Sequence, residues 1–277
     1  MKKIIVPTDF SDCAENALHV AADIARKSKN AEIHLVHVYE RPISGISLKF
    51  YIDTVELQKV KEFIQSEMTI LCQKDFLKGL EVKKHFYGDQ EIHDIPNLSV
   101  CDDADLIVMG THGSSGWREF FIGSNTQKLI RIANCPVLAI KQRHEEFKVE
   151  NLVFASNFYG EADNSFEKVK SLIELFEAKI HLLTVNTQGQ FEPTKKSRNL
   201  MTIFANKCGL TNFSTHVFND ETVEEGILHF SEEINPDLII IETHGRSGIA
   251  ELLNPSITGK VVNHIWRPVV SIKMDHR

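Results

Sequence analysis

Short apolar runs alternate with amphipathic segments along the first half of the chain. The runs are rich in β-branched residues, which is typical of buried strands. We expect strands at residues 4–6, 32–39, 81–87, 105–109 and 136–141. Between them, apolar residues recur at helical spacing, which predicts helices over residues 14–25, 54–78, 91–100 and 127–133. Strands that alternate with helices predict an α/β fold built on a parallel, doubly wound sheet.

The same order of elements begins again after residues 142–150, a charged stretch that breaks the pattern. Residues 104–141 align without gaps with residues 236–273 and are identical at 16 of 38 positions. The segment VPTDF at 6–10 also aligns with FASNF at 154–158. A repeat of this length indicates a duplicated domain, and each half is long enough to bury its own core. We therefore expect two domains, at residues 1–143 and 149–277.

Composition argues against several classes of partner. The net charge is −7, which disfavours a general nucleic-acid or membrane-surface binder because phosphate groups favour clustered Lys and Arg. No apolar run exceeds about seven residues, whereas a membrane helix needs roughly 20. The first residues, MKKIIVPTDF, predict a strand and not a signal peptide. The five cysteines are scattered and form no CxxC motif, so we expect buried free thiols and a reducing cytoplasm.

The stretch GTHGSSGWREFFIGSNT at residues 110–126 carries the strongest candidate chemistry. It follows a predicted strand, at the edge where open α/β sheets bind their ligands. Its glycines allow close approach of a ligand to the backbone, and the hydroxyl, amide and free N–H groups of a helix start suit phosphate. The positions concerned are Gly110, Gly113, Gly123, Ser124 and Asn125. A glycine-rich turn without a ligand is the alternative.

Three motifs of the first half extend this pattern. They are VPTDFS at 6–11, the strand end His37-Val38-Tyr39, and Gly110-x-x-Gly113, nine residues, then Gly123-Ser124, followed by NCPV at 134–137. In these motifs the chain resembles the universal stress protein family in its tandem two-domain form, and the resemblance covers nearly the whole chain. It implies two Rossmann-like domains of the adenine nucleotide alpha hydrolase type, each a five-stranded parallel sheet with helices on both faces. The glycine spacing is the nucleotide signature of the family's ATP-binding branch.

The resemblance implies a site for ATP or ADP with Mg²⁺ in the first half. Asp9 would lie beside the phosphates or the ribose and hold Mg²⁺, which prefers carboxylate oxygen; capping of the first helix is its alternative role. Val38 would offer its backbone to the adenine edge. His112 would donate to phosphate or brace the loop, because it recurs as His244. The other implied nucleotide-binding residues are Pro7, Thr8, Met109, Gly110, Gly113, Gly123, Ser124 and Asn125.

The second half departs from this pattern at three positions. Where the first half has Gly110, Gly123 and Asp9, the second has Glu242, Pro255 and Asn157. Glu242 would repel phosphate unless a cation intervenes, Pro255 lacks an N–H, and Asn157 lacks the charge that holds a metal. We expect the second half to have lost ATP binding and to act as a structural partner. A different ligand or a cation near Glu242 and His244 is the alternative.

No G-x-S-x-G, HExxH or Walker A motif is present in the sequence. We therefore predict a stress-associated, nucleotide-dependent sensor or regulator in the cytoplasm, and not a dedicated enzyme. The alternatives are a slow ATPase or nucleotide-processing enzyme that uses the same pocket, and a ligand-free scaffold. Each half also ends in a strand, at residues 137–141 and 269–273. In the family such strands pair antiparallel, which implies an internal pseudo-dimer and allows a homodimer of whole chains.

Overall fold

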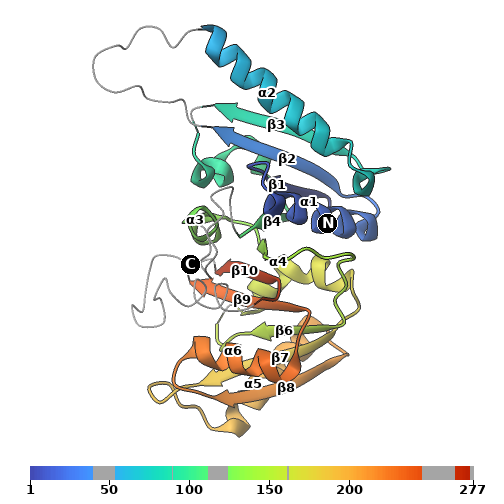
Figure 1. Ribbon diagram of the computed structural model, residues 1–277. Helices are drawn as coiled ribbons and strands as arrows, with labels where there is room; N and C mark the ends of the chain where they lie inside the picture. The colour runs from blue at the N-terminus through green and yellow to red at the C-terminus, as the bar shows by residue number, and fades with distance from the viewer. Residues whose placement is uncertain (40–53, 89, 112–123, 161, 245–265, 275–277) are drawn as a thin grey trace, which may run out of the picture.

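The computed structural model describes residues 1–39, 54–88, 90–111, 124–160, 162–244 and 266–274 (Figure 1). The first half contains β1 (Lys3–Pro7), α1 (Asp12–Ser28), β2 (Glu32–Tyr39), α2 (Thr54–Cys72), η1 (Asp75–Leu77), β3 (Val82–Gly88), η2 (Ile92–Asn97), η3 (Ser99–Cys101), β4 (Leu106–Gly110), α3 (Ser124–Ile132) and β5 (Val137–Ile140). The second half contains β6 (Asn151–Ala155), α4 (Ala162–Glu174), β7 (Lys179–Asn186), α5 (Thr194–Cys208), β8 (Phe213–Asn219), α6 (Val223–Ile234), β9 (Leu238–His244) and β10 (Val269–Met274).

All these strands form one 10-stranded sheet in the order β3-β2-β1-β4-β5-β10-β9-β6-β7-β8. Within each half the neighbouring strands are parallel, and the strand order of the second half repeats that of the first. The last strands of the halves, β5 and β10, pair antiparallel, with Val270 opposite Leu138. The predicted α/β fold is confirmed, and β3 and β8 are left as the outer strands.

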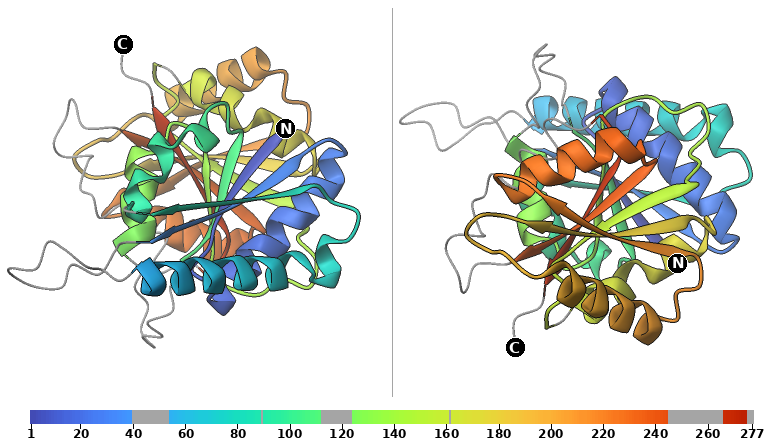
Figure 2. Two further views of the ribbon diagram at one scale, coloured as in Figure 1. Left: turned by 90° about the horizontal axis from the view of Figure 1, so that it is seen from above. Right: turned by 90° about the horizontal axis from the view of Figure 1, so that it is seen from below.

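Helices cover both faces of this twisted sheet (Figure 2). On one face, α1, α2, α4 and α5 pack against the strands in a single apolar cluster that runs through both halves. On the other face, α3 and η2 cover the first half, and α6 covers the second. The alanine-rich side of α1 lies fully buried against the sheet, because small side chains let a helix approach its strands closely.

The predicted helix over residues 91–100 is wrong. The segment forms two short 3-10 helices, η2 and η3, and Pro96 lies inside the first. A proline has no N–H to donate and its ring clashes with the preceding turn, so an α-helix does not continue through it. The predicted boundaries also shift at the glycine stretch: Gly110 is the last residue of β4, and α3 begins at Ser124.

The charged stretch between the halves is anchored to the core. Phe147 is 1% exposed, its ring packs edge-on against Phe176, and its N–H donates to Asp23 Oδ2 at 2.9 Å. Val149 is buried as well. The sequence pattern did not predict that these two residues are buried, because an isolated apolar residue among charges carries no periodic signal.

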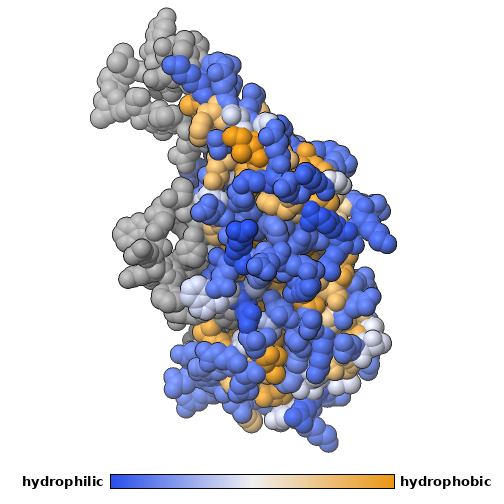
Figure 3. All heavy atoms as spheres, turned by 45° about the vertical axis from the view of Figure 1, so that its right-hand side comes forward, coloured by the Kyte–Doolittle hydropathy of each residue, from blue (hydrophilic) through white to orange (hydrophobic). Residues whose placement is uncertain are grey.

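The face of the molecule seen in Figure 3 is mainly hydrophilic, with apolar residues in small groups. No helix in the described ranges is long and apolar enough to cross a membrane. All five cysteines are free, as expected, but only Cys208 is buried and the other four are half-buried. The expectation that all five are buried is therefore wrong.

Candidate functional site

The turn between β1 and α1 is held by hydrogen bonds from its own short polar side chains. Thr8 is 7% exposed and donates its N–H to Val36 O at 2.9 Å. Its hydroxyl accepts the N–H of Phe10 at 3.0 Å. Phe10 takes up a left-handed conformation, with φ 64°. The turn follows Pro7, the last residue of β1, and sets the direction in which the next residues leave the sheet.

Asp9 lies in this turn with its side chain exposed. Its Oδ1 accepts the Ser11 hydroxyl at 2.5 Å and the Ser11 N–H at 3.1 Å. Ser11, not Asp9, is the N-cap of α1 and accepts the N–H of Ala14 at 3.3 Å. The suggested capping role of Asp9 is therefore indirect: its carboxylate orients the residue that caps the helix.

The end of β2 is tied to the same turn through His37. Its Nδ1 lies 2.8 Å from Thr8 O, and because a carbonyl only accepts, Nδ1 carries the proton. Burial lowers the pKa of His37, more than the carbonyl bond raises it, which favours the neutral ring. The ring also packs on Phe10, with centroids 4.6 Å apart. The sequence predicted no role for His37 beyond its place at a strand end. Its neighbour Val38, which was predicted to contact the nucleotide, is half-buried in β2.

The end of β4 explains why glycine is needed at position 110. A Cβ on Gly110 would lie 2.7 Å from the backbone carbon and oxygen of Cys13 and 2.8 Å from its Sγ. The first turn of α1 therefore rests directly on this glycine. The preceding Met109 is 3% exposed and belongs to the core. Cys13 was not singled out from the sequence, because its contact with Gly110 joins residues far apart in the chain.

Helix α3 begins beside the same strand end. The Thr126 hydroxyl donates to Gly110 O at 3.1 Å, and Thr126 is 2% exposed. This bond fixes the first turn of α3, which contains Ser124 and Asn125, next to β4. The free N–H groups of a helix start favour an anion at this place. Three further predicted site residues, His112, Gly113 and Gly123, lie outside the described residues.

Because β1, β2 and β4 are parallel neighbours, Asp9, Val38 and Gly110 follow or close strands at the same edge of the sheet (Figure 1). Gly110 contacts both neighbouring helices, α1 through Cys13 and the start of α3 through Thr126. Nothing in the described ranges forms a group of three or more His, Cys, Asp or Glu side chains that could hold a metal. An exposed carboxylate such as Asp9 fits a Mg²⁺ ion that takes its other ligands from phosphate and water.

The second half has the same turn but a different strand end. Phe158 has φ 56°, and its N–H donates to Ser156 Oγ at 3.0 Å, as Phe10 does to Thr8. Asn157 accepts the N–H of Tyr159 at 3.0 Å. Thr184 replaces His37, and its hydroxyl donates to Ser156 O at 3.2 Å. The repeat seen in the sequence is therefore repeated in the hydrogen bonds of the turn.

Glu242 occupies the place of Gly110, in β9. Its Oε2 accepts the Ser156 hydroxyl, and its Oε1 is buried with no hydrogen-bond partner among the described residues. Burial and the nearby charge of Asp163 raise the pKa of Glu242, and the polar contacts with Ser156 and Ser165 lower it, so that the pKa is about 7. Part of the side chain remains accessible, but the carboxyl group itself is enclosed. The second half therefore fills this space with an acid of its own.

Comparison with known proteins identifies the family of the chain. The model of the universal stress protein family matches residues 1–141 and 209–273, and the chain belongs to this family. It is 30% identical over 146 residues to Universal stress protein MJ0531 of Methanocaldococcus jannaschii, covering 52% of this chain and 85% of that protein. Universal stress protein Slr1230 of Synechocystis is 21% identical over 296 residues, covering 99% of this chain and 100% of that protein.

A solved universal stress protein from Archaeoglobus fulgidus superimposes with a TM-score of 0.76 at 18% identity, covering 98% of each chain. A second, from Pseudomonas aeruginosa, has a TM-score of 0.65 at 16% identity, covering 99% of this chain and 93% of the other. The likeness extends over nearly the whole chain. At these identities it concerns the fold alone.

Proposed function

We propose that the first half binds ATP or ADP with Mg²⁺, and that the second half does not. The observation that carries the proposal is the edge formed by the Asp9 turn, Gly110 and the start of α3. It combines an exposed carboxylate, a strand end without a side chain, and the N–H groups of a helix start. This combination suits a phosphate chain and its cation. The glycine spacing that runs on to Gly123 supports the same ligand.

The predicted roles follow from this placement. Ser124, Asn125, Gly113, Gly123 and His112 would surround the phosphates, with Gly110 at their base. Pro7, Thr8 and Met109 would border the nucleoside, and the backbone of Val38 would meet the adenine edge. Asp9 would hold Mg²⁺ while continuing to orient Ser11.

The protein would act as a nucleotide-dependent sensor or regulator in the stress response of the cytoplasm. Domains at 1–143 and 149–277 would form an internal pseudo-dimer through the β5–β10 pair. A homodimer of whole chains would form through other surfaces. Slow hydrolysis of bound ATP in the same pocket, with Asp9 and its Mg²⁺, is the alternative function.

Thermal unfolding with ATP, ADP and AMP, with and without Mg²⁺, tests the binding site. A site of micromolar affinity at millimolar nucleotide stabilises the folded protein by about 4 kcal/mol. We expect Asp9→Ala to remove the Mg²⁺-dependent part of this shift, and the matched second-half change Asn157→Ala to leave it intact. Absence of a shift with every nucleotide contradicts the proposal.

Phosphate release measured on the same variants separates the sensor from the slow ATPase. More than a few turnovers per minute, lost in Asp9→Ala and kept in Asn157→Ala, would establish the enzyme instead. Bound ATP without such turnover is the expected result.

A further inference from the structure

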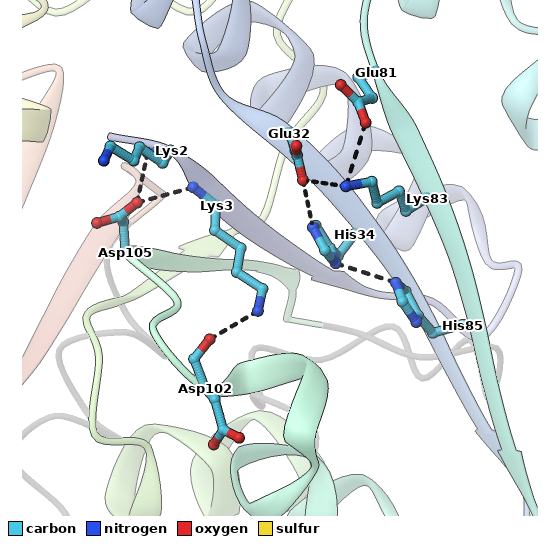
Figure 4. Close-up of polar contacts among 9 residues, drawn as sticks. All are labelled: Lys2, Lys3, Glu32, His34, Glu81, Lys83, His85, Asp102 and Asp105. Carbon is cyan, nitrogen blue, oxygen red and sulfur yellow. Dashed lines mark hydrogen bonds and ion pairs between the residues drawn. The ribbon is translucent and has the colours of Figure 1, made fainter.

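Two histidines contact each other across β2 and β3. Figure 4 shows His34 and His85 side by side, with His34 Nδ1 3.1 Å from His85 Nε2 and the ring planes 3° apart. The other ring nitrogen of His34, Nε2, lies 3.2 Å from Glu32 Oε2. Glu32 in turn accepts from Lys83 Nζ at 2.6 Å. His34 is 7% exposed, so the shared contact is largely removed from water.

The second half repeats this arrangement with the same atoms. His181 Nδ1 lies 3.2 Å from His216 Nε2, across β7 and β8. His181 Nε2 lies 3.3 Å from Asn151 Oδ1 and His181 is 5% exposed. The Ser214 hydroxyl lies 2.8 Å from His216 Nε2 and 3.2 Å from His181 Nδ1, so it contacts both rings of the second pair. The chain therefore keeps the pair in both halves although it changes the Gly110 position in the second.

The contacts determine which ring nitrogen of each pair donates and which accepts. The oxygen of Glu32 or Asn151 accepts, so the first histidine of each pair donates from Nε2. Its Nδ1 then accepts from Nε2–H of the second histidine while both rings are neutral. If both rings are protonated, two N–H groups point at each other across 3.1 or 3.2 Å, and the direct hydrogen bond between the rings is lost.

We propose that each histidine pair is a proton-operated clasp that fastens the outer strand of its half, β3 or β8, to the sheet and releases it in acid. These two strands lie at the two ends of the sheet, and each has a neighbour on one side alone. Loss of the clasp therefore acts where the sheet has least support, and an exposed edge strand is open to new partners.

The charges around the pairs predict that the second clasp responds more strongly. The first pair is acted on by Lys3, Lys83 and Glu32, and the carboxylate of Glu32 partly supports a proton on His34. Lys179 and Arg198 act on the second pair, and both are positive. Phe230 from α6 packs on His216, with centroids 4.8 Å apart, and brings no charge. The same positive neighbours disfavour a metal ion between the rings.

Burial lowers the pKa of all four histidines, and with the charge of His216 it lowers the pKa of His181 to about 4. A histidine whose pKa is lower in the folded protein stabilises the fold above its unfolded pKa. That stability is lost as the pH falls from about 6.5 toward the folded pKa. His181 alone would raise the unfolding constant about 20-fold between pH 7 and pH 5.

Two measurements without nucleotide test the clasp, so their outcome is independent of ATP binding. First, NMR titration of the histidine ring protons of the wild-type protein should give pKa values below 6.5 for His34, His85, His181 and His216. Second, urea unfolding at pH 7 and pH 5 should show less acid dependence in His216→Gln, because a glutamine amide still donates but does not titrate. His85→Gln should show a smaller effect of the same sign.

The control variant is His229→Gln. His229 bonds to Asp220 at 2.6 Å, which raises the pKa of His229, so this change should increase the acid dependence instead of reducing it. The proposal is overturned if the four pKa values are 6.5 or higher. It is also overturned if His216→Gln and His85→Gln both unfold with the acid dependence of the wild type.

Discussion

The two halves of the chain share the same turn after their first strand, but they differ in the residue at the end of the adjacent strand. Phe10 and Phe158 share the left-handed conformation and donate to the hydroxyls of Thr8 and Ser156. Beyond this turn, the first half presents Gly110 and the second presents Glu242. The turn needs only a short side chain that accepts a hydrogen bond, and threonine and serine both supply it. A carboxylate repels phosphate unless a cation intervenes, and Glu242 is enclosed where Asp9 is exposed, so we expect the halves to keep one fold and differ in nucleotide binding.

The largest predicted effect comes from closing the space at Gly110. Gly110→Val should destabilise the protein by about 3 kcal/mol or more, because the new Cβ meets the backbone of Cys13, which a side-chain rotation cannot relieve. Urea unfolding measures the loss. Gly189→Val is the control, since a Cβ there has nothing within 4 Å, and it should cost far less. Equal losses would show that the contact between α1 and β4 is not tight.

The next effect comes from Glu242. Its contribution to stability decreases as the pH rises, whereas a carboxylate with a lowered pKa contributes more at higher pH. The pKa of Glu242 is raised to about 7 from 4.5, so the folded state keeps a proton that the unfolded state releases. Stability should therefore fall by roughly 2–3 kcal/mol as the pH rises from 4.5 through 7. Glu242→Gln, measured by unfolding from pH 5 to pH 8, should lack this decrease, whereas a change at the exposed Glu221 should retain it. A parallel pH profile for wild type and Glu242→Gln would refute the assignment.

Thr126 tests the link between α3 and β4 in the first half. Thr126→Val keeps the shape but removes the hydroxyl, which leaves the Gly110 carbonyl without this donor and should cost about 1–2 kcal/mol. We also expect weaker ATP binding, because the start of α3 is no longer fixed. Thr202→Val is a matched control: that hydroxyl donates to Arg198 O at 2.8 Å on the exposed side of α5. If both variants lose the same stability, burial of the Thr126 bond has no special effect.

The smallest effect concerns Ser11. Ser11→Ala removes the N-cap of α1 and a partner of Asp9, and should cost about 1 kcal/mol. Ser11→Thr should restore most of the stability because threonine also caps. In the second half the aligned residue is Tyr159, whose hydroxyl donates to Glu192 Oε2. Thermal unfolding of the two variants checks the prediction, which fails if alanine and threonine behave alike.

Much of the fold was predictable, because each element left a local pattern. Buried parallel strands appear as apolar runs, and the repeat predicts that both halves share one arrangement. The helix over 91–100 was mispredicted although Pro96 was visible, since helical spacing was given more weight than the missing N–H. Phe147 was missed because its burial depends on Asp23 and Phe176, which no local pattern connects to it.

The contacts around the candidate site were not predictable from the sequence. Motif spacing selected Asp9 and Gly110, but it gave ligand approach as the reason for Gly110, where the structure shows the packing of Cys13. Nothing in the sequence indicated the histidine pairs, because a diagonal contact between strands cannot be recognised until their register is known. The roles of His112, Gly113 and Gly123 stay predictions, since they lie outside the described residues.

Isothermal titration of the protein with ATP and Mg²⁺ tests the difference between the halves most directly, because it counts sites. We predict one ATP per chain, with binding lost or strongly weakened in Asp9→Ala and unchanged in Asn157→Ala. Two equivalents of ATP per chain, or none, would contradict the assignment of the nucleotide site to the first half alone.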